Sequence, residues 1–233
     1  MTGKKQPDEL LDQHAIRNCR VPFRDLRVTN EAQRHNLLIT VENVLKNGPI
    51  LMGSHVLDFE KRMAAYCERT DAVGVASGTC ALYLALRSLN IGPGDEVLTS
   101  PMSWVATLNA ILMAGARPVF VDVGRDQNIN PTLIESAITK RTRAIVPVHF
   151  TGRLCDMMAI SEVARVHNLL IIEDAAQAMG AMRATYRAGS VGDAAAFSLN
   201  PMKVFPGFGE AGAVVIDDLK VSDRLRALRY LGT

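Results

Sequence analysis

The 233-residue sequence lacks the long hydrophobic run that a membrane-spanning helix requires. Its apolar stretches, such as residues 144–148 and 169–172, are far shorter than the roughly 20 residues needed to cross a bilayer. The first residues carry a pair of lysines but no apolar run behind them, so we expect no secretory signal. These absences predict a cytoplasmic protein with no membrane partner.

Paired cysteines and concentrated positive charge are also missing. The four cysteines, Cys19, Cys67, Cys80 and Cys155, are widely spaced and form no CxxC pair. This spacing disfavours a disulfide framework and a zinc site, and it favours free thiols in a reducing compartment. The formal net charge is only +2, and the basic residues are scattered. We therefore expect neither a metal centre nor a nucleic-acid partner.

What the sequence does contain is a regular alternation of helical and strand-like segments after a polar start. Residues 1–20 are polar and predict an N-terminal arm, and residues 21–233 predict one domain. Apolar spacing predicts helices over residues 30–46, 56–67, 80–89, 104–114, 131–139, 157–167 and 221–231. Short apolar runs predict strands over residues 72–76, 96–98, 118–121, 144–148, 169–173, 194–198 and 212–216.

This alternation predicts an α/β fold of three layers, with a mostly parallel mixed sheet between two layers of helices. Ligands of such sheets gather outside the carboxyl ends of the strands. Several candidate polar residues stand at those predicted ends, so we expect the functional site there.

The first candidate segment is Ser77-Gly78-Thr79, which follows a short strand and opens a helix. Backbone N–H groups at a helix N-terminus, with two hydroxyls nearby, suit a bound phosphate. Small residues in such a turn also serve as plain helix caps, so this segment alone leaves both interpretations open.

The second candidate segment is residues 173–177, with the sequence EDAAQ, at the end of a buried strand. The Asp174 carboxylate precedes small residues, so it can approach a planar ring closely and pair with a protonated ring nitrogen, as pyridoxal phosphate (PLP) requires. A helix cap and a metal ligand are the alternatives.

The third candidate segment runs from Ser198 to Lys203 and contains Pro201. A hydroxyl five residues before a lysine, with a proline shaping the turn, lets both groups reach one small anionic aldehyde. Ser198 would bind the phosphate while the Lys203 amine condenses with the carbonyl, which requires an unprotonated lysine. The alternative is a solvated surface lysine.

Trp104 is the only tryptophan, and it stands at the predicted start of a helix just after a strand. A flat aromatic side chain in that place can stack on a cofactor ring, although core packing is the alternative. The glycine-rich residues 207–212 lack GxGxxG spacing and precede a strand, so they predict a tight loop beside Lys203 and not a dinucleotide site.

Taken in order, these segments resemble the DegT/DnrJ/EryC1/StrS family of sugar aminotransferases, a branch of the fold-type I PLP-dependent enzymes. The likeness runs from about residue 21 to the last residue. The matching segments are residues 77–82 (SGTCAL), 104–110 (WVATLNA), 147–149 (PVH), 173–177 (EDAAQ) and 198–203 (SLNPMK), with the turn at 209–210 (GE).

The resemblance implies a role for each matching residue in a PLP site. Gly78 and Thr79, with Ser198, would bind the cofactor phosphate, and Trp104 would stack on the pyridine ring. The family's motifs imply three further roles. Asp174 would pair with the ring nitrogen, Gln177 would lie at the ring hydroxyl side, and Lys203 would be the Schiff base lysine.

The resemblance also implies a reaction and its partners. Lys203 would act as acid and base while an amino acid, usually glutamate, donates its amine to a keto sugar, typically linked to a nucleotide. Related dehydratases carry histidine at this position, so Lys203 favours amine transfer. Family members form homodimers with shared active sites.

Two features depart from the family pattern. Ala211 stands where glycine is common, which requires a negative φ at this residue. The chain is also shorter than family members, which implies that their C-terminal small domain is absent from this chain. A catalytically silent regulatory or partner subunit is therefore the alternative function; a flavin or nicotinamide oxidoreductase lacks a suitable fingerprint.

Overall fold

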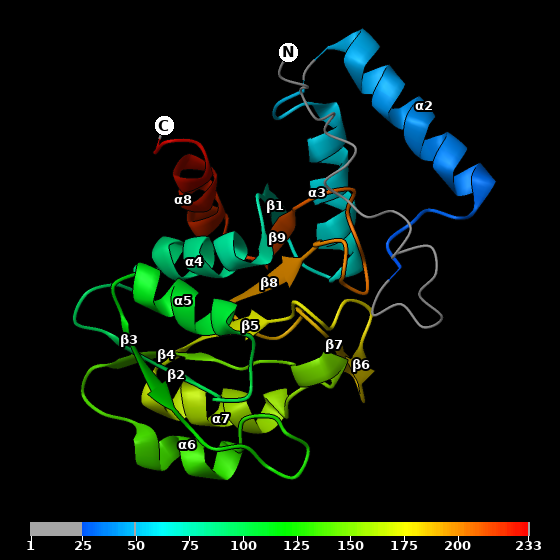
Figure 1. Cartoon of the computed structure of the whole chain (residues 1–233). Coiled ribbons are helices and arrows are strands. Elements are labelled where there is room, and N and C mark those ends of the chain that lie inside the picture. The colour runs from blue at the N-terminus through cyan, green and yellow to red at the C-terminus, as the bar shows by residue number, and fades with distance from the viewer. Residues whose placement is uncertain (1–24, 49, 233) are drawn as a thin grey trace, which may run out of the picture. The chain divides into compact units, whose positions relative to one another are not determined.

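The computed structural model describes residues 25–48 and 50–232 (Figure 1). The predicted arm over residues 1–20 lies outside the described residues. The chain divides into two units between Asn47 and Gly48. In the first unit, helix α2 (Glu31–Asn47) confirms the helix predicted over residues 30–46, and none of its side chains is buried.

The second unit is built on a seven-stranded sheet with the order β1-β9-β8-β5-β4-β2-β3. Strand β9 pairs antiparallel with both of its neighbours, and the pairs β8–β5, β5–β4, β4–β2 and β2–β3 are parallel. The mostly parallel mixed sheet is therefore confirmed. The strands are β1 (Asp71–Val75), β2 (Glu96–Thr99), β3 (Arg117–Phe120), β4 (Thr142–Val146), β5 (Leu170–Asp174), β8 (Ala194–Ser198) and β9 (Gly212–Ile216).

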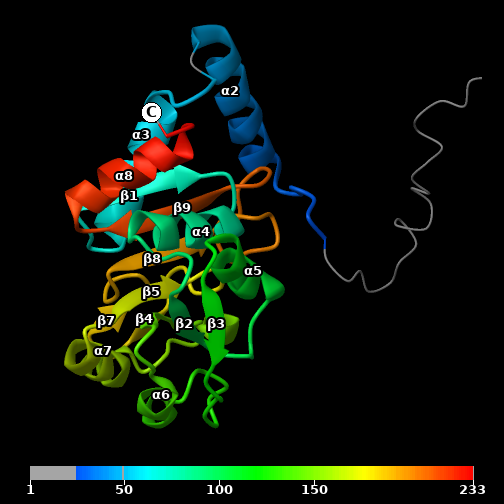
Figure 2. The ribbon, with the colours of Figure 1, turned by 90° about the vertical axis from the view of Figure 1, so that its left-hand side faces the viewer.

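Helices cover both faces of this sheet, which gives the three layers (Figures 1 and 2). One buried cluster joins the sheet to α4 (Gly78–Ser88), α5 (Val105–Met113) and α8 (Leu219–Arg229). A second cluster joins the opposite face to α3 (Ser54–Tyr66), α6 (Pro131–Ala137) and α7 (Met157–His167). Successive strand residues alternate between the two clusters, as Ile171 and Ile172 do, because side chains of a strand point to opposite faces.

The helix boundaries follow from local capping. Asp156 accepts a hydrogen bond from the Ala159 amide at the start of α7, and Asn168 ends this helix in the left-handed conformation. Asn130 caps α6, whose first residue is Pro131, a residue that the first turn of a helix accommodates.

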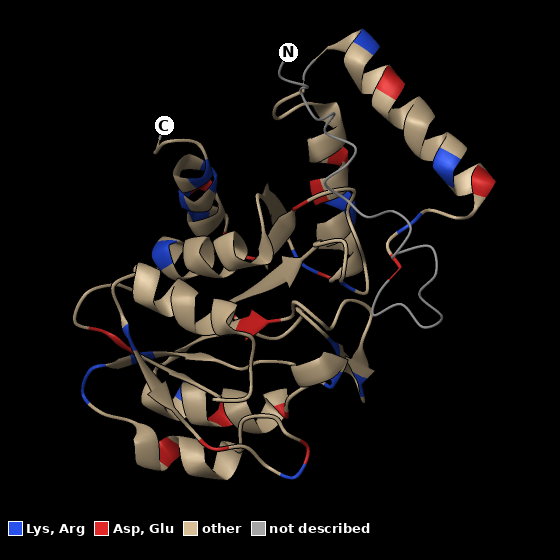
Figure 3. Cartoon of the chain, viewed as in Figure 1, with Lys and Arg blue, Asp and Glu red and all other residues tan. Residues whose placement is uncertain are grey.

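A charged cluster fastens the edge strand β1 to α3 and α8. The Glu60 carboxylate accepts hydrogen bonds from the Gly74 amide and from Arg226 and Arg229. Arg226 also pairs with Asp71 at 2.8 Å. Figure 3 shows basic residues gathered on α8 and otherwise spread over several elements. Two of the α8 arginines, Arg226 and Arg229, form ion pairs with Glu60 inside this cluster.

The structure adds details that the sequence patterns do not predict. A two-stranded hairpin, β6 (Met182–Arg183) with β7 (Tyr186–Arg187), is too short to produce a periodic pattern. Strand β9 runs antiparallel because the connection from β8 is a loop without a crossover helix. Within the described ranges, no helix is long and apolar enough to cross a membrane, and no cluster of three or more His, Cys, Asp or Glu could hold a metal ion.

Candidate functional site at the carboxyl ends of the strands

Asp174 is the last residue of β5, and its side chain points to the face covered by α4 and α5. The carboxylate is 5% exposed and accepts a hydrogen bond of 2.7 Å from the Thr107 hydroxyl of α5. The Ala176 amide donates a second, at 3.2 Å, to the other oxygen. Burial raises the pKa of Asp174 above its ordinary value, although the Thr107 hydrogen bond opposes this effect. A buried carboxylate with acceptor capacity left is suited to pair with a protonated ring nitrogen.

The N-terminus of α4 meets the end of β8 and forms a cradle for an anion. Ser77 caps the helix by accepting from the Cys80 amide at 3.1 Å, while the first helical amides, of Gly78 and Thr79, point out of the helix end. A Cβ added to Gly78 would lie 2.6 Å from Cβ and 3.0 Å from Oγ of Ser198. Only glycine therefore permits this approach, which places the Ser198 hydroxyl beside the helix N-terminus.

Lys203 lies in the loop between β8 and β9, and backbone hydrogen bonds stabilise this loop. The Lys203 amide donates to the Asn200 carbonyl at 2.8 Å, and the Leu199 amide donates to the Ala211 carbonyl at 2.8 Å. Ala211 lies outside the left-handed region, as its methyl group requires, whereas Gly209 adopts a φ of +118°. The positive charge of Lys203 opposes the effect of burial, which raises the pKa of Asp174.

Two predicted site residues, Trp104 and Gln177, are exposed and not buried. Trp104 caps α5 and is 76% exposed, so the core-packing alternative is wrong. Its carbonyl accepts from the Thr107 amide at 3.2 Å, which places it one helical turn from the partner of Asp174. Gln177 is also exposed, and its carbonyl oxygen closely approaches Gly152.

The structure reveals a second carboxylate centre whose role the sequence does not indicate. Glu173 is fully buried and accepts hydrogen bonds from three backbone amides, those of Gly189, Val191 and Gly192. The His149 imidazole completes the set at 2.8 Å. The four bonds hold the loop before β8 against the end of β5.

Electrostatics at Glu173 differ from those at Asp174. Burial by itself would raise the pKa of Glu173, but the hydrogen bonds from His149, Gly192 and Gly189 outweigh it and hold the pKa below the ordinary value. His149 Nδ1 accepts from the Cys155 amide at 3.2 Å, so the ring proton resides on Nε2 and is donated to Glu173.

Thr107 and His149 are thus the residues that sequence reasoning missed, although both stand inside quoted motifs. The available signal for Thr107 was a hydroxyl one turn inside a helix that begins at a strand end. For His149 it was a position three residues after the end of β4, at the same sheet edge as Asp174.

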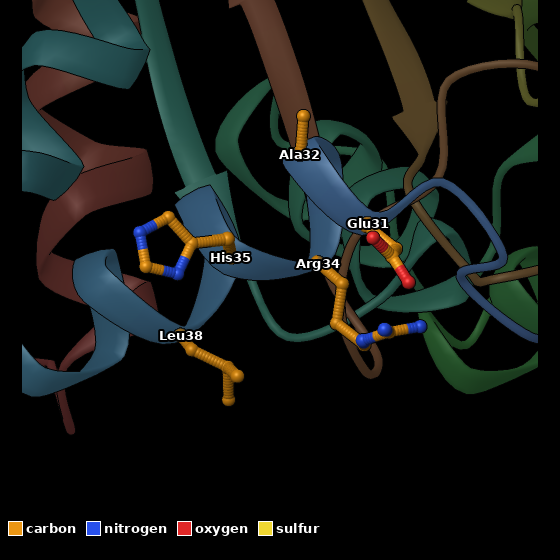
Figure 4. A pocket seen from close by; sticks show the side chains of 5 residues that line it. All are labelled: Glu31, Ala32, Arg34, His35 and Leu38. Atoms are coloured by element: carbon orange, nitrogen blue, oxygen red, sulfur yellow. The ribbon is translucent and has the colours of Figure 1, made fainter.

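A separate pocket lies beside α2 in the first unit. Figure 4 shows its five lining residues, Glu31, Ala32, Arg34, His35 and Leu38, all from this one helix. The His35 and Arg34 side chains point in different directions, and no predicted site residue contributes to it. This pocket plays no part in the site at the sheet edge.

The residues at the sheet edge fit the chemistry of PLP. The cofactor carries a phosphate, which the glycine-dependent cradle of α4 and Ser198 suits, and a ring nitrogen, which Asp174 suits. Lys203 supplies the amine. The fit rests on Gly78 in particular, because any side chain there would fill the cradle.

Comparison with known proteins agrees with this geometry. The sequence profile of the DegT/DnrJ/EryC1/StrS aminotransferase family matches residues 31–233. A dTDP-3-amino-3,4,6-trideoxy-alpha-D-glucose transaminase of Streptomyces venezuelae is 46% identical over 215 residues, which cover 92% of this chain and 57% of the relative. The chain thus spans little more than half the length of that relative.

Solved structures show the same likeness. The crystal structure of S. venezuelae DesV in complex with ketimine intermediate has a TM-score of 0.88 at 46% identity, covering 92% of this chain and 58% of DesV. NtdA of Bacillus subtilis, with bound cofactor PMP, has a TM-score of 0.85 at 34% identity, covering 90% and 48%. The chain belongs to the DegT/DnrJ/EryC1/StrS aminotransferase family.

Proposed function

We propose that this chain is the cofactor-binding part of a PLP-dependent aminotransferase that moves an amino group from an amino acid, glutamate by preference, to a keto sugar. The observation that carries the proposal is the Gly78–Ser198 cradle beside the buried Asp174 carboxylate, at the ends of the neighbouring parallel strands β8 and β5. Lys203 lies in the loop that follows β8. Residues 21–233 form the PLP-binding domain in this proposal.

Each site residue has a defined task in the proposed mechanism. When bound, PLP supplies an electron sink that allows an amine to move between two carbon atoms. The Gly78 and Thr79 amides and the Ser198 hydroxyl would hold its phosphate, and Asp174 would accept a hydrogen bond from the protonated ring nitrogen. Lys203 Nζ would hold the cofactor and would serve as the acid and base that holds the transferred proton.

The remaining cofactor contacts come from the two exposed residues. Trp104 would stack its indole on the ring, and its exposed position at the start of α5 leaves the indole available for that contact. Gln177, three residues after Asp174, would bind on the ring hydroxyl side. Both assignments rest on the family's motifs.

The acceptor class is supported by the names of relatives. Besides the dTDP-sugar transaminase above, a UDP-N-acetyl-3-dehydro-alpha-D-glucosamine 3-aminotransferase of Acidithiobacillus ferrooxidans is 41% identical over 218 residues, 93% of this chain and 59% of the relative. Both act on a nucleotide-linked sugar, with different nucleotides. We infer a nucleotide-linked keto sugar as acceptor, and the nucleotide is the variable that a substrate screen must resolve.

We further infer a cytoplasmic homodimer with shared active sites. Apolar side chains are exposed in the segments that carry the predicted site residues, including Trp104 at 76%, Val204 at 68% and Phe208 at 84%, and exposed apolar side chains of this size support an interface. The buried thiol of Cys67 is unpaired, which suits a reducing compartment. Sedimentation analysis of the chain with PLP tests the dimer.

The function is tested by incubating the chain with PLP and then with glutamate. We expect an absorbance band that borohydride bleaches while fixing the cofactor's mass on the peptide that contains Lys203. Glutamate should convert the bound cofactor to pyridoxamine phosphate. A Lys203→Ala variant that still retains the covalent mass would contradict the proposal, and a bound cofactor that glutamate leaves unchanged would favour the silent subunit.

A further inference from the structure

The hydroxyl groups of Ser103 and Thr107, at the start of α5, form a series of hydrogen bonds that ends at Asp174. Ser103 Oγ lies 2.6 Å from Thr107 Oγ1, which lies 2.7 Å from Asp174 Oδ2. An ionised carboxylate can only accept, so Thr107 donates its single proton to Asp174. Ser103 must then donate to Thr107. The two hydrogen bonds therefore point the same way, from the half-buried Ser103 through Thr107 to Asp174.

The Thr107 hydroxyl bonds a carboxylate on another element, as the Ser222 hydroxyl of α8 does with Asp71. Thr40, Ser88 and Ser136 each bond a carbonyl three or four residues earlier in their own helices. That local bond is the common outcome for hydroxyls inside helices. Thr107, which is 2% exposed, instead reaches across to a strand 67 residues away in the sequence.

The contact fixes the plane of the Asp174 carboxylate. One oxygen is held by Thr107 and the other by the Ala176 amide at 3.2 Å, so rotation of the carboxylate would break a hydrogen bond in a buried setting. Each carboxylate oxygen has a further lone pair for a ligand. Two anchors thus leave the acceptor directions of Asp174 defined before any ligand arrives.

We propose that Thr107 and Ser103 are positioning residues that aim the Asp174 carboxylate at the ring nitrogen of the cofactor. This inference rests on the proposed function, because it needs a ring with a protonated nitrogen. His149 and Lys203 are the charged or titratable groups whose electrostatic influence reaches Asp174, and the Thr107 hydroxyl supplements them with a neutral donor at hydrogen-bonding distance.

The test compares PLP with its 1-deaza analogue, in which a C–H group replaces the ring nitrogen. Dissociation constants are measured by absorbance titration of the full chain. We expect Thr107→Val to weaken PLP binding about tenfold, as loss of a hydrogen bond to a charged group predicts. Thr107→Ser, which keeps the hydroxyl, should bind within about twofold of the wild type.

The affinity for the analogue distinguishes a positioning role of Thr107 from a packing role. Wild type and Thr107→Val should bind 1-deaza-PLP equally, because Asp174 has no ring N–H to meet. An equal loss for PLP and the analogue, or a loss in Thr107→Ser as large as in Thr107→Val, would overturn the inference. Ser103→Ala, at a half-buried position, should weaken PLP alone by about threefold and serves if Thr107→Val does not fold.

The outcome for the proposed function is read separately. If the wild type binds neither PLP nor the analogue, the proposed function fails, and the positioning role fails with it. If the wild type binds PLP and Thr107→Val binds it equally well, only the positioning role fails.

Discussion

Glu173 and Asp174 are adjacent residues of β5, yet they lie on opposite faces of the sheet and have opposite environments. Glu173 is saturated by three amides and the His149 imidazole. Asp174 accepts from one hydroxyl and one amide. The pKa of Glu173 is lowered and that of Asp174 is raised, although burial acts in the same direction on both.

The difference separates a carboxylate that stabilises the fold from one suited to a ligand. Where donors surround a buried charge, the charged form is favoured and the carboxylate connects neighbouring segments. Where donors are few, the buried charge is costly until a cationic partner arrives. Glu173, one residue away, accepts four hydrogen bonds, so the shortage of hydrogen-bond donors at Asp174 is confined to its own face of the sheet.

The largest expected effect comes from replacing each carboxylate with its isosteric amide. Glu173→Gln places an NH₂ group against backbone donors and should lower the free energy of unfolding of the cofactor-free chain by about 3 kcal/mol. Asp174→Asn should change it by less than about 1 kcal/mol but abolish detectable PLP binding. Denaturant unfolding and absorbance titration measure the two effects; equal losses of stability would break the comparison.

Gly74 and Gly78 allow a similar contrast between a tolerant and an intolerant position. Gly78→Ala would push its methyl group into Ser198, so we expect PLP binding to weaken by about 10- to 100-fold. A methyl group on Gly74 would meet its nearest neighbour, Glu60 Oε1, at an ordinary 3.5 Å, which makes Gly74→Ala the control. Comparable PLP affinities for both variants would argue against the cradle.

The pH dependence of stability should sharpen the contrast between the carboxylates. Because folding lowers the pKa of Glu173, its contribution is present above its ordinary value of 4.5 and is lost as pH falls through the lower folded value. Folding raises the pKa of Asp174, so its ionisation costs stability as pH rises from 3.8 toward the higher folded value.

Cofactor-free wild type and Asp174→Asn can therefore be unfolded with urea across this pH range. The variant should gain stability relative to the wild type as pH rises above about 4, because it has no carboxylate to ionise at this buried position. A difference between the two proteins that does not change with pH would mean that Asp174 has the same pKa in the folded and unfolded chain.

The smallest expected effect on stability is that of Trp104→Ala. The side chain is 76% exposed, so the free energy of unfolding should change by less than about 0.5 kcal/mol. PLP binding should still weaken about fivefold, because the stacked ring is lost, and Trp104→Phe should restore most of it. A large loss of stability in Trp104→Ala would show that the indole packs against the fold.

Much of this organisation was predictable from the sequence. The predicted ranges 157–167, 194–198 and 212–216 coincide with α7, β8 and β9, because clear caps and apolar runs define them. The order of the predicted strands and helices also predicted that the candidate site segments stand at strand ends. Gly78 lies beside Ser198. The cofactor-binding roles expected for these two residues, for Asp174 and for Lys203 stay predictions.

The contacts between distant segments were not predictable in the same way. Thr107 lies in an apolar helical stretch, and nothing local shows that its hydroxyl meets a strand end 67 residues later. His149 and Glu173 likewise form a buried pair only because β4 and β5 are neighbours. Pairings of this kind depend on strand order, which a single sequence does not specify.

The sheet order also has a consequence for how the protein is made. Strand β1 pairs with β9, with Asp71 opposite Ile216, so the first strand of the sheet lacks its partner until the last has been synthesised. Long-range pairing of this kind slows folding. Helix α4 leads directly from β1, and its N-terminus meets β8, so the cradle cannot form until β8 has been synthesised. Until β9 has followed, the edge of β1 is exposed to other chains.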